Sequence, residues 1–130
     1  MKTSPLYFFL AIVVSSPQGV QAQGTHFSKQ FTECMNKSGG ITSAMVECIS
    51  AETQRQDQYL NKSYKALMAT LSSARKEQLQ EAQRAWIKFR DSNCSFYLDP
   101  NGGSMSRVSA GECVMTMTAS RANELVNLNR

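Results

Sequence analysis

The sequence is short of the residues that most enzyme and metal sites need. Its one histidine, His26, lies ahead of the segments with helical periodicity, so those segments can form no Ser/His or Cys/His couple. The closest two cysteines are 14 residues apart, whereas zinc ligands usually come in C-x-x-C pairs. No Gly-rich phosphate loop is present. These absences predict a protein that is not an enzyme and that uses no metal and no cofactor.

Long apolar runs are lacking as well. The run Leu6–Val14 has nine residues, too few for a membrane span, which needs about 20. Lys2 precedes this run and a small residue, Ala22, ends the segment, as in a secretory signal peptide. We therefore expect residues 1–22 to be a signal peptide and residues 23–130 to form the mature domain, with no membrane span after cleavage.

The chain also lacks the alternation of apolar and polar residues that is typical of strands, and it has no internal repeat or linker. The mature chain is the size of one small domain. The net charge is +4, or +3 without Lys2, and acidic and basic residues are interspersed. This mixed surface does not indicate a nucleic-acid partner.

Helical periodicity runs through nearly all of the mature chain. A short helix from about Phe27 is expected to stop at Gly39–Gly40, and a second, capped by Thr42 or Ser43, to continue without Pro or Gly to Leu71. A third helix is expected to carry one apolar face, made of Leu79, Ala82, Trp86, Phe89, Asn93 and Tyr97.

The loop sequence DPNGGS should end the third helix, and SAGE at 109–112 spells a capping box that would open a last helix. The predicted fold class is therefore all-α. We expect a small antiparallel helical bundle with two long helices, a short N-terminal helix and a C-terminal helix.

Four cysteines in an exported chain favour two disulfides. Cys34 and Cys48 are nearly symmetric about the first Gly turn, and Cys94 and Cys113 about the second. Residues equally far from the turn of a helical hairpin lie side by side, so we pair Cys34 with Cys48 and Cys94 with Cys113. Two other connectivities are formally open.

Polar residues accompany the apolar stripes of the long helices. In an antiparallel pair joined near Ser72, facing residue numbers sum to about 147. Arg90 then faces Asp57, and the last helix could bring Arg121 near Glu52. Because partly buried charges need partners, we interpret these residues as a structural network rather than a catalytic carboxylate pair. The network comprises Glu52, Asp57, Asn61, Tyr64, Gln83, Trp86, Arg90 and Arg121.

The array AMVEC…DQYLNKSYKALMATL…QRAWIKFRDSNC…GGS…C…T…R…L resembles the LprI-like lysozyme inhibitor family of exported bacterial proteins, over Cys34 to Leu125. The resemblance implies a helical, disulfide-bonded, periplasmic or secreted domain, and inhibition of lysozyme. It rests on Cys48, Asp57, Leu60, Asn61, Tyr64, Gln83, Trp86, Arg90, Asp91, Cys94, Gly102, Gly103, Cys113, Thr118, Arg121 and Leu125.

Two partner classes follow. The first is a host lysozyme, or another envelope protein, bound by an inhibitor. Animal lysozymes are generally strongly basic and this chain is mildly basic, so such a contact needs a local acidic or shape-complementary patch. The alternative is an envelope factor that binds an anionic glycan or an acidic protein. An enzyme is disfavoured by the missing site residues.

The expected contact surface is the loop Asp99 to Arg107, which has no helical pattern and is held at its base by Cys94 and Cys113. Loops on a rigid scaffold are common recognition sites. The candidate binding residues are Asp99, Asn101, Gly102, Gly103 and Arg107.

Overall fold

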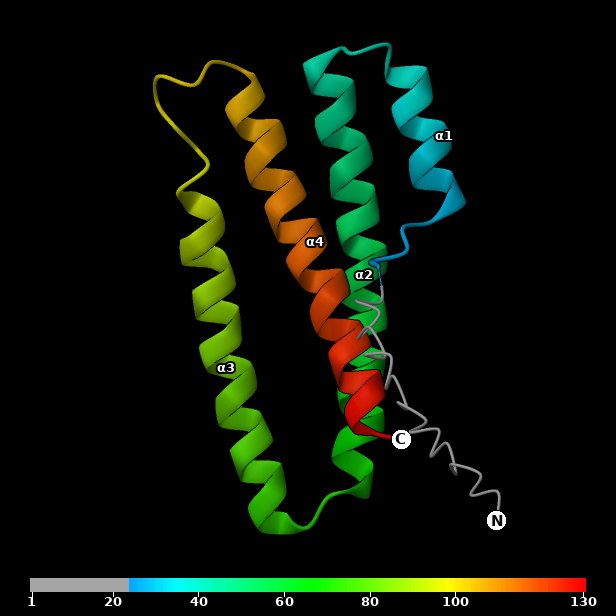
Figure 1. Cartoon of the computed structure of the whole chain (residues 1–130), viewed down its shortest axis with the longest axis vertical. Coiled ribbons are helices and arrows are strands. Elements are labelled where there is room, and N and C mark those ends of the chain that lie inside the picture. Colours follow the sequence, from blue (N-terminus) through cyan, green and yellow to red (C-terminus); the bar gives the residue numbers. More distant parts are fainter. Residues whose placement is uncertain (1–23) are drawn as a thin grey trace, which may run out of the picture.

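The computed structural model describes residues 24–130, so the expected signal peptide lies outside the described residues. Four helices make up this part of the chain (Figure 1). They are α1 (Lys29–Ser38), α2 (Thr42–Thr70), α3 (Ser73–Ser95) and α4 (Met105–Leu128). No strand occurs in residues 24–130, which confirms the all-α class.

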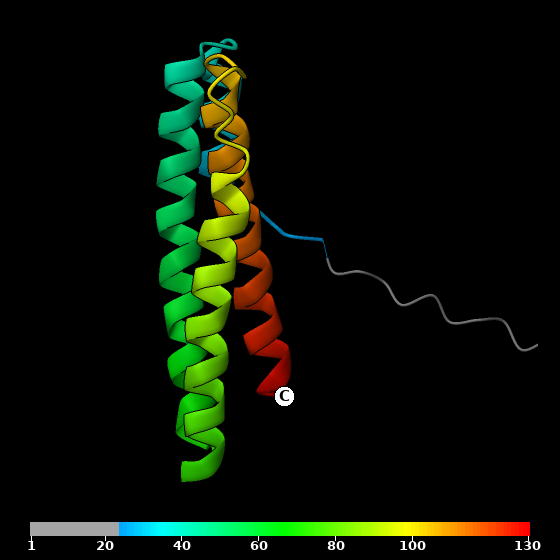
Figure 2. The ribbon, with the colours of Figure 1, turned by 90° about the vertical axis from the view of Figure 1, so that its left-hand side faces the viewer.

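All four helices lie along the long axis of the molecule (Figures 1 and 2). The α1–α2 turn and the α3–α4 loop lie at one end, and the α2–α3 turn lies at the other. A hydrogen bond of 3.3 Å between the hydroxyls of Thr42 and Ser104 joins the starts of α2 and α4. We call this end, which also carries both disulfides, the disulfide end.

The closest helix packing is between α2 and α4, which run parallel, and not between α2 and α3 as expected. Small residues on α4 allow the approach, because a Cβ on Gly111 would lie 3.0 Å from Cγ2 of Ile49. Ala119 and Ala122 on the same helix are almost fully buried. The two helices bury two apolar clusters, one around Leu60 and Leu125 and one around Ile49, Val108 and Met115.

In contrast, α3 is poorly covered. It buries only Leu79 and Cys94. Trp86 is half-buried against the Leu125 cluster, whereas Phe89 and Tyr97 are 59% and 48% exposed. The expected apolar face of this helix was therefore wrong at Phe89 and Tyr97, and also at Ala82, which is exposed. The reason is that α4 takes the place beside α2 that α3 was expected to fill.

The helix ends differ in part from the expectation. Gly39 and Gly40 have φ of 57° and 78°, a left-handed geometry that glycine adopts readily, and they end α1 as expected. Neither Thr42 nor Ser43 caps α2, because Thr42 is already its first residue. The capping box at 109–112 was also wrong, since α4 starts one turn earlier, at Met105, and contains this sequence.

Both disulfides form as expected. Cys34 bonds to Cys48 and Cys94 to Cys113, with Cα–Cα distances of 5.7 and 5.4 Å, within the usual range. Such bonds fit an extracytoplasmic location, where thiols are oxidised. Within residues 24–130, none of the helices has the length and apolar character of a membrane span.

Candidate functional site

The most deeply buried polar group in the expected network is the carboxylate of Glu52, whose exposed fraction is 0%. Ser28, just ahead of α1, donates to it through its backbone N–H at 2.9 Å and its hydroxyl at 2.5 Å. Arg55 Nε and Gln56 Nε2, one turn further along α2, each donate at 2.7 Å. Four donors therefore enclose the carboxylate and fasten the N-terminal segment to α2.

These contacts decide the protonation state of Glu52. Burial by itself raises the pKa of this carboxyl group, but the hydrogen bonds from Ser28, Gln56 and Arg55 outweigh burial and hold the pKa below its usual value. A general acid needs a raised pKa and access to substrate. Glu52 has neither property, so its geometry is that of a structural anion.

Arg121 does not lie at Glu52, where it was expected. Its Nε donates to Oε1 of Gln83 at 3.0 Å, and its Nη1 donates to Oε2 of Glu124 at 2.7 Å. The guanidinium also lies 5.9 Å from the centre of the Trp86 ring. Arg121 pairs with Glu124 rather than Glu52 because Glu124 lies three residues along the same helix. Side chains at this spacing are neighbours on the helix surface in any tertiary arrangement.

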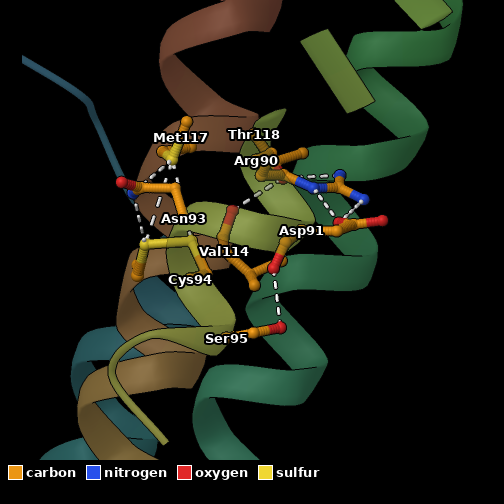
Figure 3. The surroundings of a disulfide bond; sticks show 9 residues. Arg90, Asp91, Asn93, Cys94, Ser95, Val114, Met117 and Thr118 are labelled. Carbon is orange, nitrogen blue, oxygen red and sulfur yellow. Dashed lines mark hydrogen bonds and ion pairs between the residues drawn. A yellow bond between two sulfur atoms is a disulfide. The ribbon is translucent and has the colours of Figure 1, made fainter. Parts of the chain in front are cut away.

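Arg90 has similar local partners, shown in Figure 3. It pairs with the neighbouring Asp91 at 2.8 Å and donates to Thr118 Oγ1 at 3.3 Å. Its guanidinium also lies 5.2 Å from the centre of the Trp86 ring. The two arginines thus both contact Trp86. The expected pairing of Arg90 with Asp57 is wrong, since Asp57 accepts instead from Asn61 at 3.1 Å.

The remaining network residues line a hollow of about 310 Å³ between α2 and α3. Its walls include Asp57, Asn61, Tyr64, Gln83 and Arg90. The eight expected network residues therefore do not form one network. Glu52 lies among its own donors, Arg90 and Arg121 contact Trp86, and the others line this hollow.

The base of the α3–α4 loop is fixed by a cluster of sulfur atoms (Figure 3). Beside the Cys94–Cys113 bond, Asn93 Nδ2 lies 3.5 Å from Cys113 Sγ and 3.6 Å from Met117 Sδ. Cys94 is only 1% exposed. The disulfide and these contacts hold the last turn of α3 against α4.

The candidate binding residues Asp99, Asn101, Gly102, Gly103 and Arg107 are all exposed. The expected loop was wrong at its end, because α4 begins at Met105 and Arg107 lies in its first turn. The Asp99 carboxylate accepts from the Asn101 N–H at 2.8 Å, and the Asp99 carbonyl accepts from the Gly102 N–H at 3.0 Å. Gly103 has a φ of 64°. The loop is thus built from hydrogen-bonded turns with its polar tip facing solvent.

Beside this loop is an apolar surface that the sequence reasoning missed. Phe96 is 87% exposed, and Leu98 and Met105 are each 51% exposed. They line a hollow of about 650 Å³ together with Tyr97 and loop residues. The signal was present in the sequence as three consecutive large apolar residues, FYL at 96–98, because a helix face cannot bury all three.

Arg90→Ala is expected to lower the free energy of unfolding by about 1–2 kcal/mol, through loss of the contacts with Trp86 and Thr118. Asp57 does not pair with Arg90, so the substitution leaves no buried carboxylate without a partner. The larger cost of an unpaired buried charge therefore does not arise. Urea unfolding would measure the difference, with Arg84→Ala at an exposed site of α3 as the control. A loss above about 3 kcal/mol for Arg90→Ala alone would show that it neutralises a buried charge.

Comparison with known proteins gives a family match over most of the chain. The family model for lysozyme inhibitor LprI matches residues 34–125, a range that contains both disulfides, α2 and α3. An uncharacterized protein of Rhizobium meliloti (strain 1021) is 30% identical over 95 residues, which cover 62% of this chain and 68% of that protein. No solved structure matches.

Proposed function

The chain belongs to the LprI lysozyme inhibitor family, and from this membership we propose that it is a periplasmic or secreted protein that binds and inhibits a lysozyme. The family match over residues 34–125 carries this proposal. The side chains support a binding role rather than catalysis. The deepest carboxylate, Glu52, is enclosed and ionised, and Arg90 and Arg121 are occupied by neighbouring side chains.

Export is the second part of the proposal. Two disulfides, the expected signal peptide and the family match all favour a location outside the cytoplasm. We expect the mature chain to begin at Gln23. N-terminal sequencing of protein from periplasmic and secreted fractions would test this, and a retained Met1 in either fraction would contradict it.

The inhibitory contact is proposed to include residues 99–107, which form the α3–α4 loop and the first turn of α4. The five candidate residues in this segment are exposed, and the disulfide between Cys94 and Cys113 fixes its base. A surface that is ordered before binding loses less conformational entropy when the complex forms.

The direct test adds purified mature protein to lysozyme acting on bacterial cell walls and follows the clearing of turbidity. We expect slower clearing with at least one lysozyme type. Unchanged clearing with several types in the presence of excess protein would contradict the inhibitor proposal and favour the alternative, an envelope factor that binds an anionic glycan or an acidic protein.

Loop variants are expected to weaken inhibition without changing the melting temperature. Asn101→Ala and Arg107→Ala remove exposed side chains, and Asp99→Asn removes a charge while keeping the oxygen that accepts from the Asn101 N–H. We expect each to raise the inhibition constant about threefold to tenfold, as for peripheral contacts of a protein interface. Unaltered inhibition in all three variants would place the contact elsewhere.

A further inference from the structure

We propose that the disulfide end of the bundle is a docking surface for a basic protein, and that Phe96 is its apolar anchor. The inference rests on the proposed function only for the choice of lysozyme as that protein. It extends that function by naming the anchor and the charge of the partner's surface.

The first observation is where apolar side chains are exposed. Nine large apolar residues are exposed within residues 24–130, and five of them lie in or next to the two connections at the disulfide end. Ile41 lies in the α1–α2 turn, whereas the other four, Phe96, Tyr97, Leu98 and Met105, line one hollow. Grouping of exposed apolar residues is typical of protein interaction sites, whereas single exposed residues are not.

The second observation is that the backbone of Phe96 is held in place although its side chain is exposed. It follows α3 directly, and its N–H bonds to the Asn93 carbonyl at 3.3 Å. It is two residues from the buried Cys94, and its ring packs edge-on against Tyr97 with 6.4 Å between ring centres. The backbone that presents this ring is therefore ordered before binding, and a large aromatic ring that can be covered by a partner is a common interface hot spot.

The third observation is the distribution of charge along the bundle. The contact of Arg90 with Thr118, and the parallel alignment of α2 and α4, put residues 57, 90 and 118 at about the same level. The ion pair of Arg90 with Asp91 is counted with the disulfide half, residues 24–57 and 90–117, which then contains seven acidic and five basic residues, a net charge of −2. The other half, residues 58–89 and 118–130, contains three acidic and eight basic residues, a net charge of +5.

This separation of charge explains how a chain with a positive net charge can attract a basic partner. The chain as a whole is basic, but the end with the exposed apolar residues is acidic. A basic partner is therefore attracted to the disulfide end and repelled by the opposite end, so the field orients the encounter as well as accelerating it.

The acidic charge of the disulfide end disfavours two other partners that could cover its apolar residues, a lipid membrane and a second copy of this chain. Anionic lipid headgroups attract basic segments, and the disulfide end is acidic. A closed dimer through this end would bring two acidic surfaces together. A head-to-tail contact between copies would satisfy the charges but would lead to open chains rather than a closed assembly.

The test compares Phe96→Ala with Phe89→Ala, which removes an equally large ring that is 59% exposed on α3, outside the disulfide end. Binding to a basic lysozyme is measured by titration calorimetry, and inhibition by cell-wall clearing. We expect Phe96→Ala to raise Kd at least tenfold and Phe89→Ala to change it less than twofold. Both variants should melt like the wild type, because both rings are exposed.

The charge is tested separately. The double variant Asp99→Asn, Glu112→Gln removes two exposed acids at the disulfide end, and Glu77→Gln, Glu81→Gln removes two from the opposite half. We expect the first pair to lower the association rate several-fold at low salt, with a smaller difference at high salt. The second pair should leave the rate unchanged or raise it.

The outcomes separate this inference from the proposed function. Equal Kd values for the wild type and Phe96→Ala, with inhibition intact, would overturn the docking surface and leave the function standing. Phe96-dependent binding without inhibition would contradict the function and support the surface. No binding of the wild type to any lysozyme, Phe96-dependent dimers in light scattering, or Phe96-dependent binding to anionic vesicles would each overturn the inference.

Discussion

Leu125→Ala is expected to lower the free energy of unfolding by about 3–5 kcal/mol, near the upper end for a buried leucine. Leu125 has an exposed fraction of 0% and lies in the cluster where α2, α3 and α4 meet, with Leu60, Leu67 and Leu79. The loss of stability has two parts, the lost burial of the leucine side chain and the cavity that the substitution leaves. The cavity cannot close easily, because α2 and α4 already approach closely and cannot move inward.

The matched control is Leu128→Ala, three residues along the same helix and 59% exposed, for which we expect a change within about 0.5 kcal/mol. Urea unfolding followed by circular dichroism at the helix band would measure both variants. A loss below about 1 kcal/mol for Leu125→Ala would mean that the α2–α4 contact does not form the core of this domain.

The helices and both disulfides could be predicted from the sequence because each depends on local information. The periodicity of apolar residues gives the helices, and the Gly turns give the symmetric cysteine pairs. The helix that packs on α2 could not be predicted in this way. An apolar stripe shows which face of a helix is buried but not which helix covers it, and the small residues Gly111, Ala119 and Ala122 select α4.

The sequence identified polar residues that make side-chain contacts, but it did not identify their partners correctly. The predicted partners lay on other helices, whereas Arg90 and Arg121 pair with acidic residues one and three positions away on their own helix. The contact between Ser28 and Glu52 was missed although it could have been found. The symmetry that pairs Cys34 with Cys48 also places Ser28 close to the level of Glu52 on α2.

Glu52→Ala is expected to lower the free energy of unfolding by about 3 kcal/mol, because the donors around the carboxylate lose a buried acceptor. The Ser28 N–H and hydroxyl lose the acceptor that fastens the segment ahead of α1, whereas the side chain of Arg55 is 38% exposed and can turn to water. Glu81→Ala, which removes an exposed acid from α3, controls for the lost charge and should cost less than about 0.5 kcal/mol.

The same carboxylate predicts how stability depends on pH. The pKa of Glu52 is lower in the folded protein than in the unfolded chain, so its contribution is present above the unfolded value of about 4.5 and is lost as pH falls through the folded value. We therefore expect the wild type to lose stability below pH 4.5 more steeply than Glu52→Gln, which carries no titrating group at this site. Urea midpoints between pH 3 and 7 would measure both proteins. Parallel curves would mean that the four donors do not hold the ionised form of Glu52.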